Sequence, residues 1–155
     1  MNTRRALLLL HLLGVAAFFG SLLVHALGGW LTGDTGPAST LPVLLERVAW
    51  TVTVPGLWIA VMAGSTLALS GFASFGDRWI QLKVAAALAM IVITHVVLLP
   101  ALVEAARTAA SGTAAVSGDY ADPLRTVGIA AVADLGLAAM AAVAGVWKFG
   151  RRRRR

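Results

Sequence analysis

Residues 85–93 read Ala-Ala-Ala-Leu-Ala-Met-Ile-Val-Ile, an apolar run with no polar side chain. A strand of a membrane barrel alternates polar and apolar residues, and this run does not. It lies within an apolar stretch over residues 79–103, and about 20 such residues suffice for a helix to cross a bilayer. A helix also pairs its backbone groups within the segment, as lipid requires. The stretch therefore predicts a transmembrane helix.

Three more apolar stretches of similar length occupy residues 6–31, 48–72 and 124–149. The segments between them are rich in turn formers: 32–42, the pair Gly76–Asp77, and 104–123, which ends in an Asp-Pro helix start signal. The sequence thus predicts an all-α fold, a four-transmembrane-helix bundle forming one integral membrane domain over residues 1–155.

The composition excludes several other classes of protein. Hydrophobic residues make up 59% of the 155 residues and charged residues only 13%, against about 25% charged in soluble proteins. This excludes a soluble globular domain, and intrinsic disorder requires the opposite balance. The absence of cysteine excludes disulfides, thiolate metal sites, iron–sulfur clusters and cysteine nucleophiles.

The net charge of +6 is concentrated at the two ends of the chain, in Arg4, Arg5, Lys148 and Arg151–Arg155. Basic residues that flank apolar segments tend to stay in the cytoplasm and attract anionic lipids. We therefore expect both termini to be cytoplasmic. The expected partners are the lipid bilayer and, at the basic C-terminus, anionic lipids; we do not expect the protein to bind nucleic acid.

Two helical faces predict close packing inside the bundle. In the first helix one face carries polar and small residues together with Phe18, at alternating spacings of three and four: His11, Gly14, Phe18, Ser21, His25 and Gly28. In the second helix a small residue occupies every fourth position, at Gly56, Ala60, Gly64 and Ala68. Small residues drive helix association in lipid, so we expect tight contacts and a homo-oligomer.

Five ionisable residues lie within the predicted spans, at His11, His25, Lys83, His95 and Asp134. Such residues are costly in hydrocarbon and mark functional sites by default. A rise of about 1.5 Å per residue places His11 and Lys83 at one depth, and the other three in the outer half. Structural roles remain open for each: a hydrogen bond to a carbonyl, partial solvation, or a lysine that reaches the membrane surface.

Histidines at similar depth on different helices can ligate a haem between them. His11, His25 and His95 are accordingly the candidate cofactor and metal ligands. Asp134 could orient a histidine through its second ring nitrogen, and Lys83 could pair with an anionic group of a cofactor. Lys83 and His95 are twelve residues apart and cannot both point into one narrow site.

Short motifs resemble the HemJ-type protoporphyrinogen oxidases, and equally the CopD-type copper-resistance proteins and a related family of small bacterial membrane proteins. They comprise the segment 8–20 around His11, then Arg47, Pro55 and Gly64, then Trp79, Lys83 and His95. The resemblance implies a bacterial inner (plasma) membrane protein with haem b, and ties His11 and Lys83 to haem binding and activity. The sequence departs from the HemJ pattern at Phe18–Phe19 and in lacking its last-helix Asn-Glu, for which Asp134 is the nearest acid.

We therefore predict a haem-b-binding membrane redox protein acting on a porphyrinogen, with a porphyrin or quinone-type small molecule as partner. Lys83 and Asp134 are the candidate catalytic residues. One alternative is copper transport along histidines and the methionines Met62, Met90 and Met140. Another is a non-catalytic membrane scaffold whose polar residues only specify packing.

Overall fold

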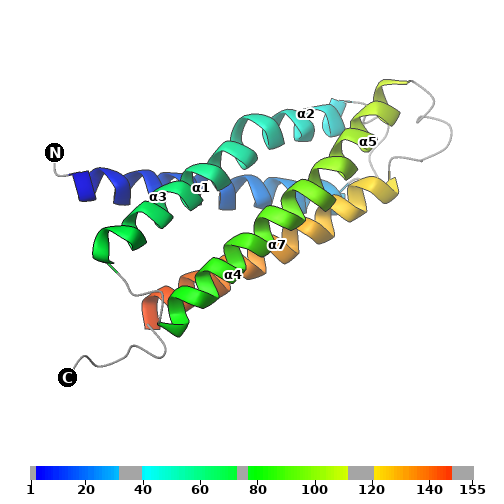
Figure 1. The fold of residues 1–155 in the computed structure, drawn as a ribbon. Helices are drawn as coiled ribbons and strands as arrows, with labels where there is room; N and C mark the ends of the chain where they lie inside the picture. The colour runs from blue at the N-terminus through cyan, green and yellow to red at the C-terminus, as the bar shows by residue number, and fades with distance from the viewer. Residues whose placement is uncertain (1–2, 32–39, 73–76, 112–120, 148–155) are drawn as a thin grey trace.

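The computed structural model describes residues 3–31, 40–72, 77–111 and 121–147, and all regular structure in these ranges is helical (Figure 1). In chain order the elements are α1 (Thr3–Leu31), α2 (Thr40–Val48), η1 (Ala49–Thr53), α3 (Val54–Leu67), η2 (Ala68–Phe72), α4 (Arg78–Val92), η3 (Ile93–Leu98), α5 (Leu99–Ala110) and α7 (Ala121–Trp147). Four continuous helices in the described ranges are long and apolar enough to cross a membrane: Thr3–Trp30, Thr40–Ser70, Arg78–Ala110 and Ala121–Trp147. The all-α, four-span prediction is confirmed.

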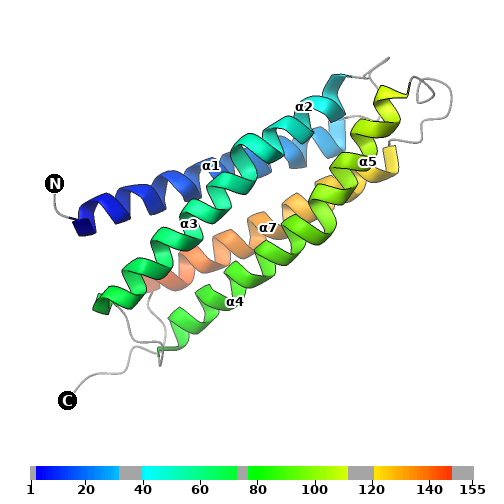
Figure 2. The same cartoon turned by 45° about the horizontal axis from the view of Figure 1, so that its top comes forward.

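Helix α1 packs along both α3 and α7, α4 packs along α7, and α2 packs against α5. Helices α3 and α4 are consecutive in the chain but make little contact with each other (Figure 2). One end of the bundle contains the start of α1 and the end of α7. It also contains the end of α3 and the start of α4, which follow each other in the chain. We call it the terminal end. The cytoplasmic location of that end remains a prediction.

Two helices extend beyond their predicted limits. The second begins at Thr40 instead of residue 48, and the third continues to Ala110 instead of 103. These extensions are amphipathic: Leu45 of α2 and Ala105 of α5 are buried, and the two helices pack together, whereas Glu104 and Arg107 are exposed and form an ion pair at 3.9 Å. An average hydrophobicity does not reveal such a half-polar helix, although its apolar face packs well.

The first helix starts at Thr3, and the last covers Ala121–Trp147, close to the predicted 124–149. Asp77 precedes α4 in an extended conformation, as expected for the turn. Gly76 and the basic residues Lys148 and Arg151–Arg155 lie outside the described residues.

Three π-helical segments occur in the described ranges: η2 lies at the end of the second span, whereas η1 and η3 interrupt the second and third spans and each precedes a proline. Segment η1 ends two residues before Pro55, and η3 ends two residues before Pro100. Proline lacks a backbone N–H, and its ring clashes with the carbonyl four residues earlier. A wider turn before the proline accommodates that clash within a continuous span.

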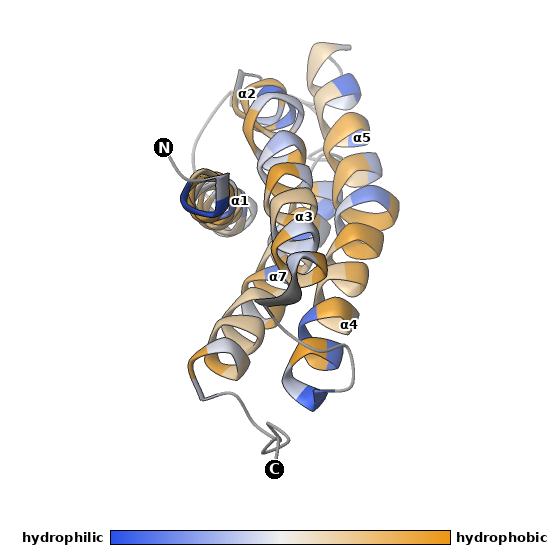
Figure 3. Ribbon diagram, turned by 60° about the vertical axis from the view of Figure 1, so that its left-hand side comes forward, coloured by the Kyte–Doolittle hydropathy of each residue, from blue (hydrophilic) through white to orange (hydrophobic). Residues whose placement is uncertain are grey.

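Large apolar side chains face outward, as expected for a protein whose solvent is lipid. Figure 3 shows hydrophobic colour over most of the helix surface and hydrophilic colour at the starts of α1 and α4. The exposed residues include Leu9, Leu13, Leu27, Met62, Leu88, Val96, Ile129 and Val146. The buried polar side chains in the described ranges are Ser21, His25, Thr53, Thr94 and Asp134. The chain is a multi-pass membrane protein.

Both predicted packing faces lie inside the bundle. A Cβ atom added at Gly14 of α1 would lie 2.6 Å from the backbone nitrogen of Ala60, and one at Gly56 would lie 2.9 Å from that of Phe18. The small-residue face therefore packs against α1 of the same chain and gives no support to a homo-oligomer, which stays a prediction. A second close crossing joins α1 to α7, where a Cβ at Gly29 would lie 2.6 Å from the Gly128 backbone.

Candidate functional site

The half-buried side chain of His11 lies against α3 near the terminal end. Its Nδ1 is 2.8 Å from the carbonyl oxygen of Ala60, so Nδ1–H donates to that carbonyl. The ring rests on Gly64, where a Cβ would come within 3.0 Å of Nδ1 and Cε1. A neutral imidazole carries one ring hydrogen. The Nε2 atom is therefore left with its lone pair, the usual state of a metal-binding histidine.

Lys83 on α4 points toward α7. A Cβ at Gly145 would lie 2.5 Å from the Lys83 Nζ, so the lack of a side chain at Gly145 gives the ammonium its space. The same Nζ lies 5.7 Å from the ring centre of Trp79, within the range of a cation–π contact. The lysine is half-buried.

His11 and Lys83 share one depth, as predicted, but point at different neighbours. Antiparallel α1 and α7 meet at Gly29 and Gly128. Measured from that crossing, His11 lies about 27 Å along α1 and Gly145, beside Lys83, about 26 Å along α7. We call His11 and Lys83 the terminal layer. Within the described residues no contact joins these two side chains.

Four fully buried polar side chains, one from each span, form a second group. His25 Nε2 lies 2.9 Å from Thr53 Oγ1, and Thr94 Oγ1 donates to Asp134 Oδ2 at 2.9 Å. All four residues are 0% exposed. We call His25, Thr53, Thr94 and Asp134 the buried polar cluster.

The two pairs of this cluster lie at similar depth. From the Gly29–Gly128 crossing, His25 is about 6 Å along α1 and Asp134 about 9 Å along α7 in the same direction. Each pair also leaves one buried atom without a hydrogen-bond partner among the described residues: Nδ1 of His25 and Oδ1 of Asp134.

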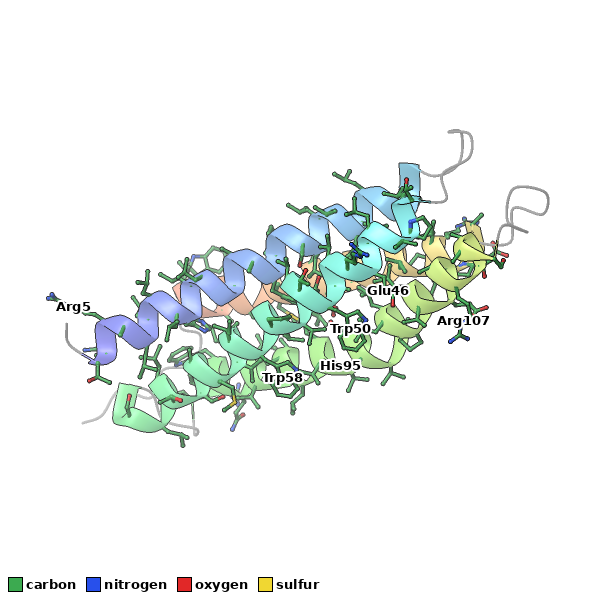
Figure 4. The ribbon with its side chains drawn as sticks, turned by 90° about the horizontal axis from the view of Figure 1, so that it is seen from above. Arg5, Glu46, Trp50, Trp58, His95 and Arg107 are labelled. Carbon is green, nitrogen blue, oxygen red and sulfur yellow. The ribbon has the colours of Figure 1, made fainter. Side chains whose placement is uncertain are left out.

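His95 belongs to neither group. Its Nδ1 donates to the carbonyl of Ile91 on the same helix at 2.9 Å, and its ring meets the Trp58 indole edge-on at 6.0 Å between centres. Figure 4 shows Trp58 and His95 together between the second and third spans. Lys83 and His95 thus face different neighbours, as their spacing predicts.

The arrangement fits a haem at one of the predicted positions and not at the other. His25 uses Nε2 for Thr53, and His95 faces Trp58, so these two histidines do not form a facing pair of axial ligands. His25 is fully buried, and Leu22, Leu57 and Leu98 belong to one hydrophobic core cluster. At His11 the carbonyl of Ala60 holds Nδ1, which in this tautomer leaves the Nε2 lone pair for a ligand.

Nothing in the described ranges favours a copper path. Met62 is 63% exposed and Met140 40% exposed, whereas Met90 is buried, so the three thioethers do not line one route. No group of three or more histidine or acidic side chains suited to a metal ion occurs among the described residues.

The sequence interpretation missed two residues, Thr53 and Thr94. It expected Asp134 to orient a histidine, but the carboxyl accepts from Thr94 instead. Both threonines lie deep in apolar spans, where an unpaired hydroxyl is costly. That cost is the signal that could have identified them.

Comparisons of the chain with protein-family models, with curated proteins and with solved structures find no match.

Proposed function

We propose that this multi-pass membrane protein binds haem b near the terminal end, with His11 as an axial ligand, and serves a redox reaction on a porphyrinogen. The observation that carries the proposal is the Nδ1–Ala60 hydrogen bond of 2.8 Å, which fixes the His11 ring and leaves Nε2 for iron. The missing side chain at Gly64 supports this placement, because it gives the imidazole room to lie against α3.

Lys83 supports the same proposal. Its ammonium lies at the depth of His11 and is held over Trp79 by the space at Gly145. A positive charge at that depth would neutralise a porphyrin carboxylate, which is otherwise costly near hydrocarbon. When bound, haem b supplies one-electron redox chemistry, and the protein supplies position and electrostatics.

Haemin titration of the purified protein tests the proposal. We expect the wild-type protein to show a Soret band that shifts on reduction. The His11→Ala variant should lose this band, and the Lys83→Ala variant should bind haemin more weakly by about tenfold or more. His95→Ala is the matched control, because its Nδ1 also donates to a carbonyl but its ring lies elsewhere. A wild-type protein without a Soret band, or a His11→Ala variant that binds haemin normally, would refute the proposal.

A further inference from the structure

The buried polar cluster contains an acid and a base whose unpaired atoms are complementary. The hydroxyl of Thr53 donates to the carbonyl of Val48 at 3.4 Å. With the hydroxyl hydrogen directed at Val48, Thr53 Oγ1 accepts from His25, and in this tautomer Nε2 carries the imidazole hydrogen. The buried Nδ1 of His25 is then an acceptor without a donor.

Asp134 presents the opposite requirement. Its Oδ2 accepts the Thr94 hydroxyl hydrogen, and its Oδ1 has no donor among the described residues. A carboxylate buried in hydrocarbon with one neutral donor is strongly disfavoured, whereas a carboxylic acid needs only one acceptor for its O–H. Protonation at Oδ1 therefore gives a neutral group whose free O–H is a donor without an acceptor.

The other charged groups around Asp134 are distant or engaged elsewhere. On α4, Lys83 reaches Gly145, about 16 Å further along α7. On η3, His95 donates to Ile91, and on α5, Glu104 and Arg107 are exposed and paired. On α7 itself, Asp122 and Arg125 are exposed near the start of the helix. Two histidines thus lie near the depth of Asp134. His95 follows Thr94 in the chain and has its Nδ1 engaged by Ile91, whereas His25, from α1, has a buried Nδ1 without a partner among the described residues.

We infer that Asp134 and His25 form a membrane-buried acid–base pair that binds and exchanges one proton. The two atoms do not bond to each other directly, so the proton moves from Oδ1 of Asp134 to Nδ1 of His25 through a bridging water, and leaves a carboxylate and an imidazolium. The net charge of the pair is zero in both states, so exchange creates no isolated charge in the membrane. A hydrogen bond to Thr53 holds His25 and one from Thr94 holds Asp134, and the inference does not depend on haem binding.

Infrared spectroscopy of the protein in lipid nanodiscs tests the pair. At neutral pH we expect a carboxylic acid C=O band that is lost in Asp134→Asn and retained in Asp122→Asn, the matched control that removes an exposed carboxylate from the same helix. Transfer to D2O should shift the band, because the proton exchanges. His25→Gln should also shift it, because the acceptor of the acid changes.

Each other outcome overturns the inference. A missing band in the wild type means that the carboxyl is ionised. A band that ignores both D2O and His25→Gln means a buried acid with a structural role only. Should Asp134→Asn fail to fold, ¹³C-labelling of aspartate in the unmutated protein must shift the band, and a band unchanged by the label belongs to another group.

Discussion

The terminal layer and the buried polar cluster use the same kinds of side chain in different surroundings. His11 and Lys83 are half-buried and point at separate neighbours, whereas His25, Thr53, Thr94 and Asp134 are fully buried in two hydrogen-bonded pairs. An accessible imidazole with a free Nε2 can take a large ligand. A fully buried imidazole is closed to a large ligand but can still exchange a proton. The exposure of the side chains therefore distinguishes the proposed ligand binding in the terminal layer from the proposed proton exchange in the buried polar cluster more clearly than residue type does.

The largest expected effect on stability comes from a substitution that forces α1 and α7 apart at their Gly29–Gly128 crossing, next to the buried polar cluster. In Gly29→Leu the new Cβ would lie 2.6 Å from the Gly128 backbone, which cannot yield as a flexible side chain can. We expect a loss of about 3 kcal/mol or more in the free energy of unfolding, measured by SDS titration followed by circular dichroism. Gly136→Leu is the control, since nothing lies within 4 Å of a Cβ there. Equal losses in the two variants would show that the crossing does not seal the cluster.

The Thr94→Val substitution should cause an intermediate loss of stability and so tests the buried polar cluster directly. Valine keeps the shape of threonine but removes the donor to Asp134, so a buried polar group loses its partner. We expect destabilisation of about 1–3 kcal/mol in the same assay. Thr66→Val removes a hydroxyl that is exposed and bonded to its own helix at Met62, and should change stability by less than about 0.5 kcal/mol. A loss as large in Thr66→Val would contradict the distinction between sealed and accessible positions.

The smallest effect is expected in the terminal layer, from Gly145→Ala. The new methyl group would displace the Lys83 ammonium, and a lysine side chain can move aside, so stability should change by less than about 1 kcal/mol. The displaced amine should react faster with an amine-specific acylating reagent, as followed by mass spectrometry of Lys83. An unchanged labelling rate would show that Gly145 does not position the lysine.

The sequence was sufficient for the parts of the fold that depend on hydrophobicity and periodicity. Four spans, the inward stripe through His11 and His25, and the small-residue face at Gly56 all follow from helical spacing. The extensions at Thr40–Val48 and up to Ala110 were missed, because their stability comes from the contact between α2 and α5 and not from average hydrophobicity.

The candidate sites were predictable in depth but not in direction. Counting residues along helices placed His11 level with Lys83, and the structure agrees through Gly145. Counting could not show that His95 turns toward Trp58 while His25 turns toward Thr53. The direction of a side chain depends on how the helices cross and on the π-helical segments, neither of which a residue count contains.

The segments η1 and η3 also determine how the second and third spans tolerate changes in length. A π turn holds one more residue than the α turn that could replace it. Deletion of one residue within η1 or η3 would therefore restore α-helical winding and leave the two halves of the span in nearly the same rotation, whereas a deletion from an α-helical part would rotate one half against the other by about 100°. In the second span, such a deletion between Leu45 and η1 would turn Leu45 away from α5 or Thr53 away from His25. Homologous chains that keep both contacts should therefore differ in length in their loops or within the π-helical segments, and not in the α-helical parts of the spans.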